Sequence, residues 1–256
     1  MSLRVTAAAL AALSLVVAVP PAMAKTKTPI KNIVLVHGAW ADGSGWQGVY
    51  NILVKDGYKV SVVADPLTSL ADDVAATERV LARQDGPVLL VGHSYGGAVI
   101  TEAGNDPKVV GLVYISAFAP DDGENILGLL PKSDAPPPFE VDKQGFAFLK
   151  RDAFLAAFAP DVGPELAAFM ADEQVPLSVP NAGTVAIKDP AWKNKPSWYF
   201  STKGDQIIPP SLQHMMAARM KAKVLVDSEG SHVGFISHPD AAAALIEQAA
   251  KSVKVK

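Results

Sequence analysis

A serine between glycines follows a strongly apolar run near the middle of the chain. The run Val88-Leu89-Leu90-Val91 predicts a short strand buried on both faces. Gly92-His93-Ser94-Tyr95-Gly96 comes next and fits the pattern Gly-x-Ser-x-Gly, and a small-residue helix follows. A strand that reverses into a helix so abruptly exposes the serine hydroxyl above the free N–H groups of the helix N-terminus. The stretch therefore predicts Ser94 as a nucleophile.

A carboxylate and a histidine follow later predicted strands. Asp205 comes after the predicted strand 197–201, and His232 comes after the predicted strand 222–227. Loops that follow parallel strands open on the same edge of the sheet, where the sites of open α/β folds form. The order Ser, Asp, His matches the hydrolase form of the catalytic triad, in which histidine takes the serine proton and aspartate orients the histidine.

Other side chains compete for these two roles. The remaining histidines are His37, His93, His214 and His238. Only His232 stands in a loop of small residues after a late strand, which favours it as the base. Asp227 and Glu229 compete with Asp205 for the acid, but they lie very close to His232 in the sequence and would not approach it from a separate strand.

A second apolar run, residues 32–37, ends in His37-Gly38-Ala39-Trp40. A loop of this kind after an early strand typically supplies one backbone N–H of an oxyanion hole, which we assign to Ala39. The residue after the nucleophile, Tyr95, supplies the other. We expect the side chain of His37 to be structural, buried and hydrogen-bonded to backbone groups.

The segment Gly43-Ser44-Gly45-Trp46-Gln47-Gly48 matches the dinucleotide pattern Gly-x-Gly-x-x-Gly, and Asp65 follows a further predicted strand. Residues 37–42, however, separate the glycines from the preceding strand, and Trp46 is bulky where a backbone must approach a pyrophosphate. We therefore expect a flexible loop before a helix over 46–55, and no nicotinamide cofactor.

Strands and helices alternate along most of the chain, which predicts an α/β fold with a mostly parallel sheet and helices on both faces. The predicted strands cover residues 32–37, 58–63, 88–91, 109–115, 197–201 and 222–227. The predicted helices cover residues 46–55, 70–83 behind the N-cap Ser69, the stretch after Ser94, 210–220 and 239–252.

The alternation stops over residues 121–192. Three prolines at 136–138 interrupt the chain, and helical patterns resume around 145–158 and 164–173. An insertion between two strands of such a sheet predicts a helical cap over the active site. Many phenylalanines lie in this insertion, and we expect most of them to form its own small core and the rest to line a pocket.

Trp40 and Phe118 lie in predicted loops beside Ser94, and we expect them to border the substrate pocket. An apolar pocket gains about 0.8 kcal/mol for each methylene that it buries. Because the predicted cap is short, we expect it to enclose a pocket that only small groups can fill. We therefore expect small uncharged substrates, with short apolar chains or aromatic groups.

The composition excludes several classes of function. The chain has 256 residues, 23 Lys and Arg against 26 Asp and Glu, and a net charge of −3, with no basic run for nucleic acid. It has no cysteine, so disulfides, thiol catalysis and cysteine-bound metals are excluded. It carries no His-Glu-x-x-His motif, and the proposed chemistry requires neither metal nor cofactor.

Residues 1–24 have the features of a secretory signal peptide. Arg4 is followed by the apolar stretch from Val5 to Val19 and by Ala22-Met23-Ala24, a cleavage site of the Ala-x-Ala type. The apolar stretch is about 15 residues long, shorter than the roughly 20 that span a bilayer, so we expect no membrane anchor. The mature protein would be one domain, residues 25–256, secreted or periplasmic.

With these motifs the chain resembles the α/β-hydrolase superfamily, above all the small carboxylesterases, methyl esterases and hydroxynitrile lyases. The resemblance spans residues 33 to about 238. It rests on His37-Gly38-Ala39-Trp40, Gly92-His93-Ser94-Tyr95-Gly96-Gly97, Gly204-Asp205 and His232. It implies a six-stranded sheet with the first strand between the second and third, and Ala39 and Tyr95 as oxyanion donors.

Within that group, the lyases resemble a form with threonine at the position of Gly38 and lysine at the position of Val233. The absence of this threonine and this lysine favours a serine hydrolase that cleaves esters through an acyl-enzyme. A cofactor-free lyase, lactonase or perhydrolase would keep the same triad. A ligand-binding protein with a vestigial site would keep it too.

Overall fold

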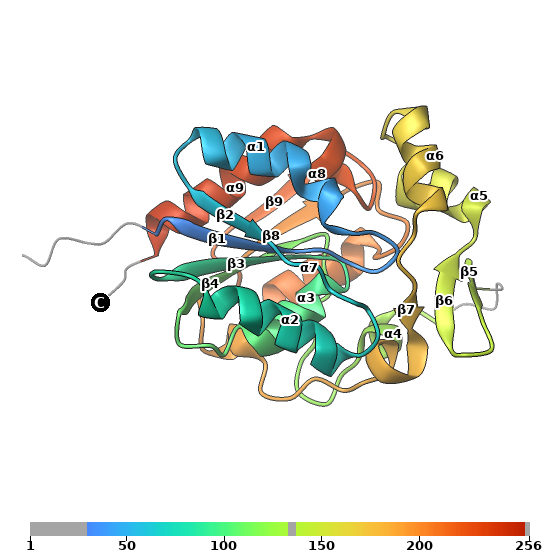
Figure 1. The fold of residues 1–256 in the computed structure, drawn as a ribbon, viewed down its shortest axis with the longest axis horizontal. Coiled ribbons are helices and arrows are strands. Elements are labelled where there is room, and N and C mark those ends of the chain that lie inside the picture. Colours follow the sequence, from blue (N-terminus) through green and yellow to red (C-terminus); the bar gives the residue numbers. More distant parts are fainter. Residues whose placement is uncertain (1–29, 133–136, 254–256) are drawn as a thin grey trace, which may run out of the picture.

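A six-stranded parallel sheet forms the centre of the protein (Figure 1). The computed structural model describes residues 30–132 and 137–253, so the predicted signal peptide lies outside the described residues. In spatial order the strands are β2 (Lys59–Val62), β1 (Asn32–Val36), β3 (Val88–His93), β4 (Val109–Ile115), β8 (Ser197–Thr202) and β9 (Leu225–Ser228). The first strand lies between the second and third, as the family resemblance implied.

Helices cover both faces of the sheet, and each face has its own hydrophobic core. On one face lie α1 (Gln47–Lys55), α8 (Gly234–Ser237) and α9 (Pro239–Ser252), and on the other lie α2 (Leu70–Ala82), α3 (Gly96–Ala103) and α7 (Pro210–Arg219). Successive side chains of a strand point to opposite faces. Thus Ile33 and Leu35 enter the first core, while Val34 and Val36 enter the second. Burial on both faces explains why this strand is apolar throughout.

The predicted start of α2 is confirmed, because the Ser69 hydroxyl accepts a 3.0 Å hydrogen bond from the Asp72 amide. The glycine-rich segment before α1 differs from the prediction of a flexible loop. Residues Gly43–Trp46 form a turn of 3₁₀ helix, whose first free amide, that of Ser44, donates to the Asp42 carboxylate. Trp46 is fully buried against Phe235. A Cβ at Gly45 would lie 3.3 Å from Ile236, and one at Gly48 would lie 3.0 Å from Pro239, so these glycines permit close packing.

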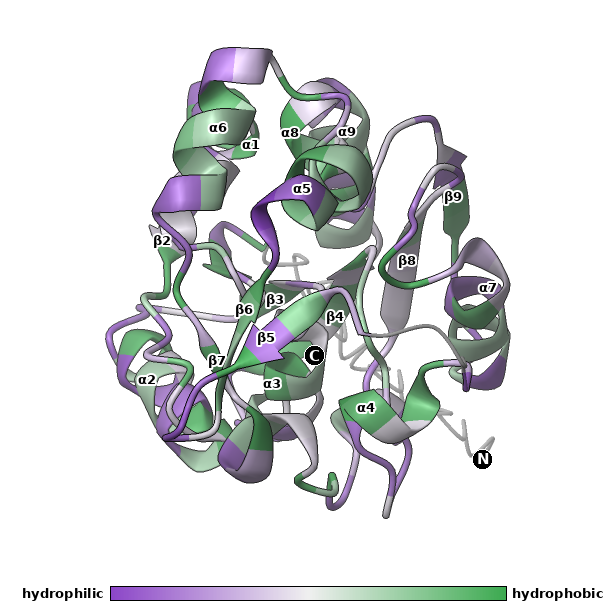
Figure 2. Ribbon diagram, turned by 90° about the vertical axis from the view of Figure 1, so that its right-hand side faces the viewer, coloured by the Kyte–Doolittle hydropathy of each residue, from purple (hydrophilic) through white to green (hydrophobic). Residues whose placement is uncertain are grey.

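We call residues 121–192 the cap segment. Its elements are α4 (Ile126–Leu129), β5 (Phe139–Val141), β6 (Phe146–Leu149), α5 (Arg151–Ala153), a π-helical turn (Phe154–Phe158), α6 (Pro164–Asp172), β7 (Leu177–Ser178), a second π-helical turn (Val179–Gly183) and a 3₁₀ turn (Ala191–Lys193). Strands β5, β6 and β7 form a small antiparallel sheet. These strands and helices α5 and α6 lie over the carboxyl ends of the sheet strands, and Figure 2 looks onto them. The last residues of the cap segment run along α3, where the Lys188 amide donates to Glu102 and the Asp189 carbonyl accepts from Asn105.

The expectation of helix over residues 145–158 is wrong for its first part, which is strand β6. The cause is the preceding turn. The Asp142 carboxylate accepts hydrogen bonds from the amides of Gln144 and Phe146, at 2.9 and 2.8 Å, and Gly145 has a φ of +88°. An aspartate and a glycine so placed reverse the chain into a hairpin.

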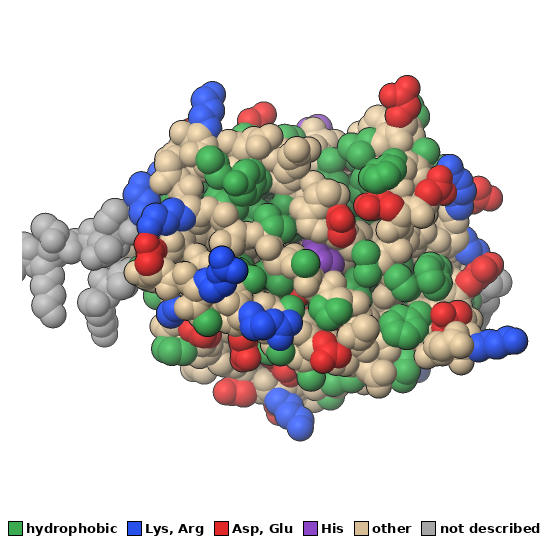
Figure 3. All heavy atoms as spheres, viewed as in Figure 1, with side chains coloured by type: hydrophobic (Ala, Val, Ile, Leu, Met, Phe, Trp, Pro, Cys, Tyr) green, Lys and Arg blue, Asp and Glu red, His purple; other side chains and the backbone are tan. Residues whose placement is uncertain are grey.

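The surface carries no large patch of one charge on the face drawn in Figure 3, where acidic and basic side chains are interspersed. Over residues 30–132 and 137–253, no helix combines the length and the hydropathy needed to cross a bilayer.

Candidate active site

Ser94 stands at a sharp reversal between β3 and α3. Its φ is +52°, in the left-handed region that a non-glycine residue enters only at a cost of about 1–3 kcal/mol. Gly92 allows the reversal, because a Cβ there would lie 2.5 Å from the Gly96 carbonyl oxygen. The Ser94 carbonyl accepts a 3.0 Å hydrogen bond from the Phe118 amide, which fixes the strained turn. The predicted strand–turn–helix context is therefore present.

The three side chains predicted to act together are in direct contact. His232 Nε2 lies 2.8 Å from Ser94 Oγ, and His232 Nδ1 lies 2.8 Å from Asp205 Oδ2. All three residues are buried. With a proton on Nδ1 donated to Asp205, Nε2 is free to accept the proton of the serine hydroxyl. This arrangement can activate Ser94 as a nucleophile.

The Asp205 carboxylate is held by three further donors. The amides of Ile207 and Ile208 donate to Oδ1 at 2.8 and 2.9 Å. The buried side-chain amide of Gln213, on α7, donates to Oδ2 at 2.8 Å. Gln213 was not predicted from sequence, because a glutamine within a helix has no distinguishing local pattern.

The competing carboxylates lie elsewhere and have other partners. Asp227 pairs with His214 at 2.6 Å on the surface. Glu229 pairs with Lys203 at 2.6 Å, and both of those side chains are more than half exposed. The structure therefore brings Asp205, and neither alternative, against His232.

Two other histidines lie near the site and have structural contacts. His37 is buried, its Nε2 accepts from the Asp65 amide at 3.0 Å, and its Nδ1 lies 3.0 Å from the Gly38 carbonyl. Because Nε2 accepts from an amide, it carries no proton, and burial lowers the pKa of His37. His93 donates from Nε2 to the His232 carbonyl at 3.0 Å, and burial, followed by the charge of His232, holds its pKa well below the usual value.

The two predicted oxyanion donors lie beside Ser94. Ala39 and Tyr95 both line the pocket that contains the serine. Within the described part of the chain, no group accepts a hydrogen bond from either amide N–H, which leaves both for a ligand. The loop approaches the serine closely at Gly38, where a Cβ would lie 2.6 Å from the Cβ of Ser94.

Trp40 connects the loop of the predicted oxyanion hole to the cap segment. Its φ is +60°, and its amide donates a 3.0 Å hydrogen bond to the Val175 carbonyl. Its indole Nε1 donates to the Ala147 carbonyl of β6 at 2.9 Å. These two bonds hold the backbone next to Ala39 in an otherwise unfavourable conformation.

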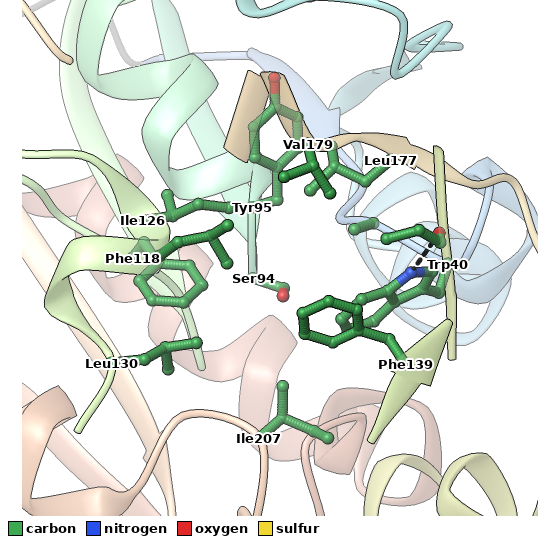
Figure 4. A pocket seen from close by; sticks show the side chains of 13 residues that line it. Trp40, Ser94, Tyr95, Phe118, Ile126, Leu130, Phe139, Leu177, Val179 and Ile207 are labelled. Atoms are coloured by element: carbon green, nitrogen blue, oxygen red, sulfur yellow. Dashed lines mark hydrogen bonds between the residues drawn. The ribbon is translucent and has the colours of Figure 1, made fainter. Parts of the chain in front are cut away.

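A pocket opens onto Ser94 (Figure 4). Its lining consists of Ala39, Trp40, Ser94, Tyr95, Phe118, Ile126, Leu127, Leu130, Phe139, Ala147, Leu177, Val179 and Ile207. Trp40 and Phe118 are thus where they were predicted. Phe139 is one of the cap phenylalanines expected to line a pocket. The other large side chains from the cap segment, such as Ile126, Leu130 and Leu177, were not predicted individually, because the strands of the cap segment were not predicted.

The residues around the pocket provide no set of metal ligands. Across residues 30–132 and 137–253, no three His, Cys, Asp or Glu side chains gather closely enough to bind a metal ion. Among the residues that line the pocket, Ser94, Tyr95 and Trp40 carry polar side-chain atoms. The site can therefore carry out nucleophilic attack and oxyanion stabilisation from its own side chains and backbone.

The chain is similar to known hydrolases and esterases. A carbendazim-hydrolyzing esterase from Nocardioides sp. is 36% identical over 124 residues, which cover 41% of this chain and 49%, about half, of that protein. A pyrethroid hydrolase from Sphingobium wenxiniae is 28% identical over 243 residues, 82% of this chain and 84% of that protein. The crystal structure of polyneuridine aldehyde esterase shares the fold with a TM-score of 0.71 at 19% identity, over 85% of this chain and 98% of that one.

A family model matches a larger part of the chain. It is described as the alpha/beta hydrolase family, and the match runs over residues 33–245, from the first strand into the last helix. The match includes Ser94, Asp205 and His232. The protein belongs to the α/β hydrolase family.

Proposed function

We propose that the protein is a carboxylesterase that cleaves small uncharged esters through an acyl-enzyme on Ser94. The observation that carries the proposal is the unbroken series of contacts from Asp205 through His232 to the Ser94 hydroxyl, at the base of an apolar pocket. The similarity to a carbendazim-hydrolyzing esterase and to a pyrethroid hydrolase supports the same class of reaction.

In the first half of the reaction, Ser94 Oγ attacks the ester carbonyl carbon while its proton passes to His232 Nε2. Asp205 accepts the Nδ1 proton in a hydrogen bond and stabilises the imidazolium that forms. The amides of Ala39 and Tyr95 donate to the oxyanion, and each contributes roughly 3 kcal/mol in comparable sites. The C–O bond to the alcohol then breaks, and His232 returns the proton to the departing oxygen.

In the second half, water replaces the alcohol. His232 takes a proton from the water, whose oxygen attacks the acyl carbon, and the same amides hold the second oxyanion. The bond to Ser94 Oγ breaks as His232 protonates that oxygen. One ester and one water give one acid and one alcohol, with no electrons exchanged.

The pocket supports an uncharged substrate. Its walls are aliphatic and aromatic, and no Lys or Arg lies among the lining residues. A charged group would lose its hydration there without an ionic partner. Apolar acyl or aryl groups gain about 0.8 kcal/mol per buried methylene.

Two positions favour hydrolysis over the lyase reaction of similar proteins. At Gly38 a threonine would place its Cβ 2.6 Å from the Cβ of Ser94, which the present loop does not accommodate. Val233 is buried, 1% exposed, next to Phe235 in an apolar cluster, where a lysine would be unfavourable.

The experiment combines labelling with turnover. A fluorophosphonate probe should label Ser94 alone, by peptide mapping, and Ser94→Ala should lower kcat on p-nitrophenyl esters at least ~10³-fold. Labelling of another serine, or full turnover by Ser94→Ala, would contradict the proposal. A protein that binds the esters without releasing p-nitrophenol would be a vestigial binding protein instead.

A further inference from the structure

Asp161, in the cap segment between the π-helical turn and α6, contacts the loop that carries His232. Its Oδ2 accepts from the Ser231 amide at 2.8 Å and from the Ser237 hydroxyl at 2.7 Å. Its Oδ1 accepts from the Ser231 hydroxyl. One carboxylate of the cap segment thus binds the residue directly before His232 by both its amide and its side chain.

The Ser231 hydroxyl extends this contact to the other side of the histidine. It accepts a 3.2 Å hydrogen bond from the amide of Val233 and lies 3.0 Å from the carbonyl oxygen of Phe158. The residues before and after His232 are therefore fixed through one buried hydroxyl, which Asp161 orients. His232 itself lies between two anchored neighbours.

The loop is shaped to receive the carboxylate. Gly230 has a φ of +117°, which L side chains rarely adopt, and a Cβ there would lie 2.9 Å from Asp161 Oδ2. The same part of the cap segment also touches the imidazole, because the Phe158 ring lies 5.0 Å from the His232 ring, centre to centre. The cap segment thus contacts this loop in two places, at the Gly230 backbone and at the His232 ring.

Asp161 is ionised at neutral pH. Partial burial would raise its pKa, but the hydrogen bonds from Ser231 and Ser237 outweigh burial and hold the pKa below its usual value. An ionised acceptor makes shorter and stronger hydrogen bonds than a neutral one.

We propose that Asp161 is a positioning residue that holds His232 in line between Ser94 and Asp205, so that the cap segment completes the catalytic base. This inference rests on the proposed esterase function, because it assigns His232 the role of base. Two 2.8 Å contacts from one ring leave little tolerance for movement of its loop. A misplacement of 1 Å can cost roughly 10²-fold in rate.

The test compares Asp161→Ala and Asp161→Asn with Asp172→Ala. Asp172 is a cap carboxylate of the same charge, and its partner is the surface residue Arg151, 3.3 Å away. With p-nitrophenyl acetate, we expect Asp161→Ala to lower kcat about 10-fold, within the roughly 10²-fold limit above, and to leave KM nearly unchanged. Asp172→Ala should keep the wild-type kcat. Ser237→Ala removes one of the hydrogen-bond donors to Asp161, and its kcat should lie between those of Asp161→Ala and Asp172→Ala.

A proton NMR measurement provides a readout independent of turnover. The buried Nδ1–H of His232 donates to Asp205 and should give a downfield resonance that His232→Ala abolishes. In folded Asp161→Ala this resonance should broaden or shift, and in Asp172→Ala it should not. If wild-type protein shows the resonance but no esterase activity, the proposed function fails while the effect of Asp161 on the resonance remains measurable.

Two results would overturn the inference. One is wild-type kcat and an unchanged resonance in a folded Asp161→Ala or Asp161→Asn variant. The other is a lower Tm with an unchanged kcat per folded molecule, which would make Asp161 a purely structural contact. If Asp161→Ala does not fold, the kcat and the resonance of Asp161→Asn and Ser237→Ala test the inference, because each variant keeps part of the contact.

Discussion

The Tyr95 hydroxyl donates a 2.7 Å hydrogen bond to the buried carboxylate of Asp73. This hydroxyl points away from Ser94 (Figure 4). The other oxygen of Asp73 accepts from the Leu67 amide at 2.8 Å, and the Leu67 carbonyl accepts from Ser178 of β7 at 3.0 Å. The proposed oxyanion donor is thereby connected to α2 and to the cap segment through hydrogen bonds.

We expect Tyr95→Phe to lower the free energy of unfolding by about 1–3 kcal/mol, because it leaves a buried carboxylate oxygen without its donor. Urea unfolding of Tyr95→Phe, Asp73→Asn and the double variant measures this in a double-mutant cycle. The two single changes should be strongly non-additive. Simple additivity would show that the contact contributes nothing.

Asp205→Asn should leave the fold intact and lower kcat by up to ~10⁴-fold, because the amide favours the wrong tautomer of His232. Asp227→Asn is the matched control, since its carboxylate pairs with His214 on the surface. It should retain kcat near the wild-type value. Loss of activity in Asp227→Asn with an active Asp205→Asn would reverse the assignment of the acid.

Asp65 should make the stability of the protein depend on pH. Burial, reinforced by the charge of Asp73, raises the pKa of Asp65 to about 8, and both of its carboxylate oxygens lack partners among the described residues. The unfolded chain has a pKa of about 3.9, so the folded state binds one more proton between these values. The contribution of Asp65 to stability is therefore complete below about pH 4 and is lost as the pH rises through about 8.

Asp65→Asn cannot titrate and should remove this slope, which reaches about 1.4 kcal/mol per pH unit. Urea unfolding at pH 5, 6.5 and 8 compares the two proteins. The wild-type protein should lose stability relative to Asp65→Asn as the pH rises. If the free energies of unfolding of the two proteins differ by the same amount at every pH, Asp65 is ionised in the folded state.

The pocket should limit the length of the acyl chain. Apolar side chains of the cap segment, among them Leu130, Phe139 and Val179, form part of its wall and bound the space beside Ser94. With p-nitrophenyl esters from acetate to palmitate, kcat/KM should rise by up to about fourfold per methylene, then fall beyond about eight acyl carbons. A steady rise to palmitate would indicate an open groove.

Export should produce a shorter protein. Cleavage after Ala24 gives a mature chain that begins at Lys25. Intact mass measurement of protein from the periplasm or medium of a bacterial host tests this. Full-length protein retained in the cytoplasm would contradict a cleaved signal peptide, and a chain that begins elsewhere would move the cleavage site.

The sheet and the contact between Ser94, His232 and Asp205 were predictable from sequence because their signals are local. Strands buried on both faces are uninterrupted apolar runs, and the loops after them carry Ser94, Asp205 and His232 to one edge. The cap segment was not predictable in the same way. Strand β7 has only two residues and exists because it pairs with β6, and Asp161 matters only through a loop 70 positions away in sequence.

The two hydrogen bonds of Trp40 to Val175 and Ala147 affect how the protein can be engineered. A cap transplanted from a relative to change specificity would bring a new pocket wall, but it would also replace the acceptors that keep Trp40 in its unfavourable backbone conformation. A chimeric cap must therefore place backbone carbonyl groups where those of Val175 and Ala147 lie, and it must keep the carboxylate of Asp161. Specificity in this protein is best altered by single substitutions in the lining, such as Leu130 or Ile126, which leave those anchors in place.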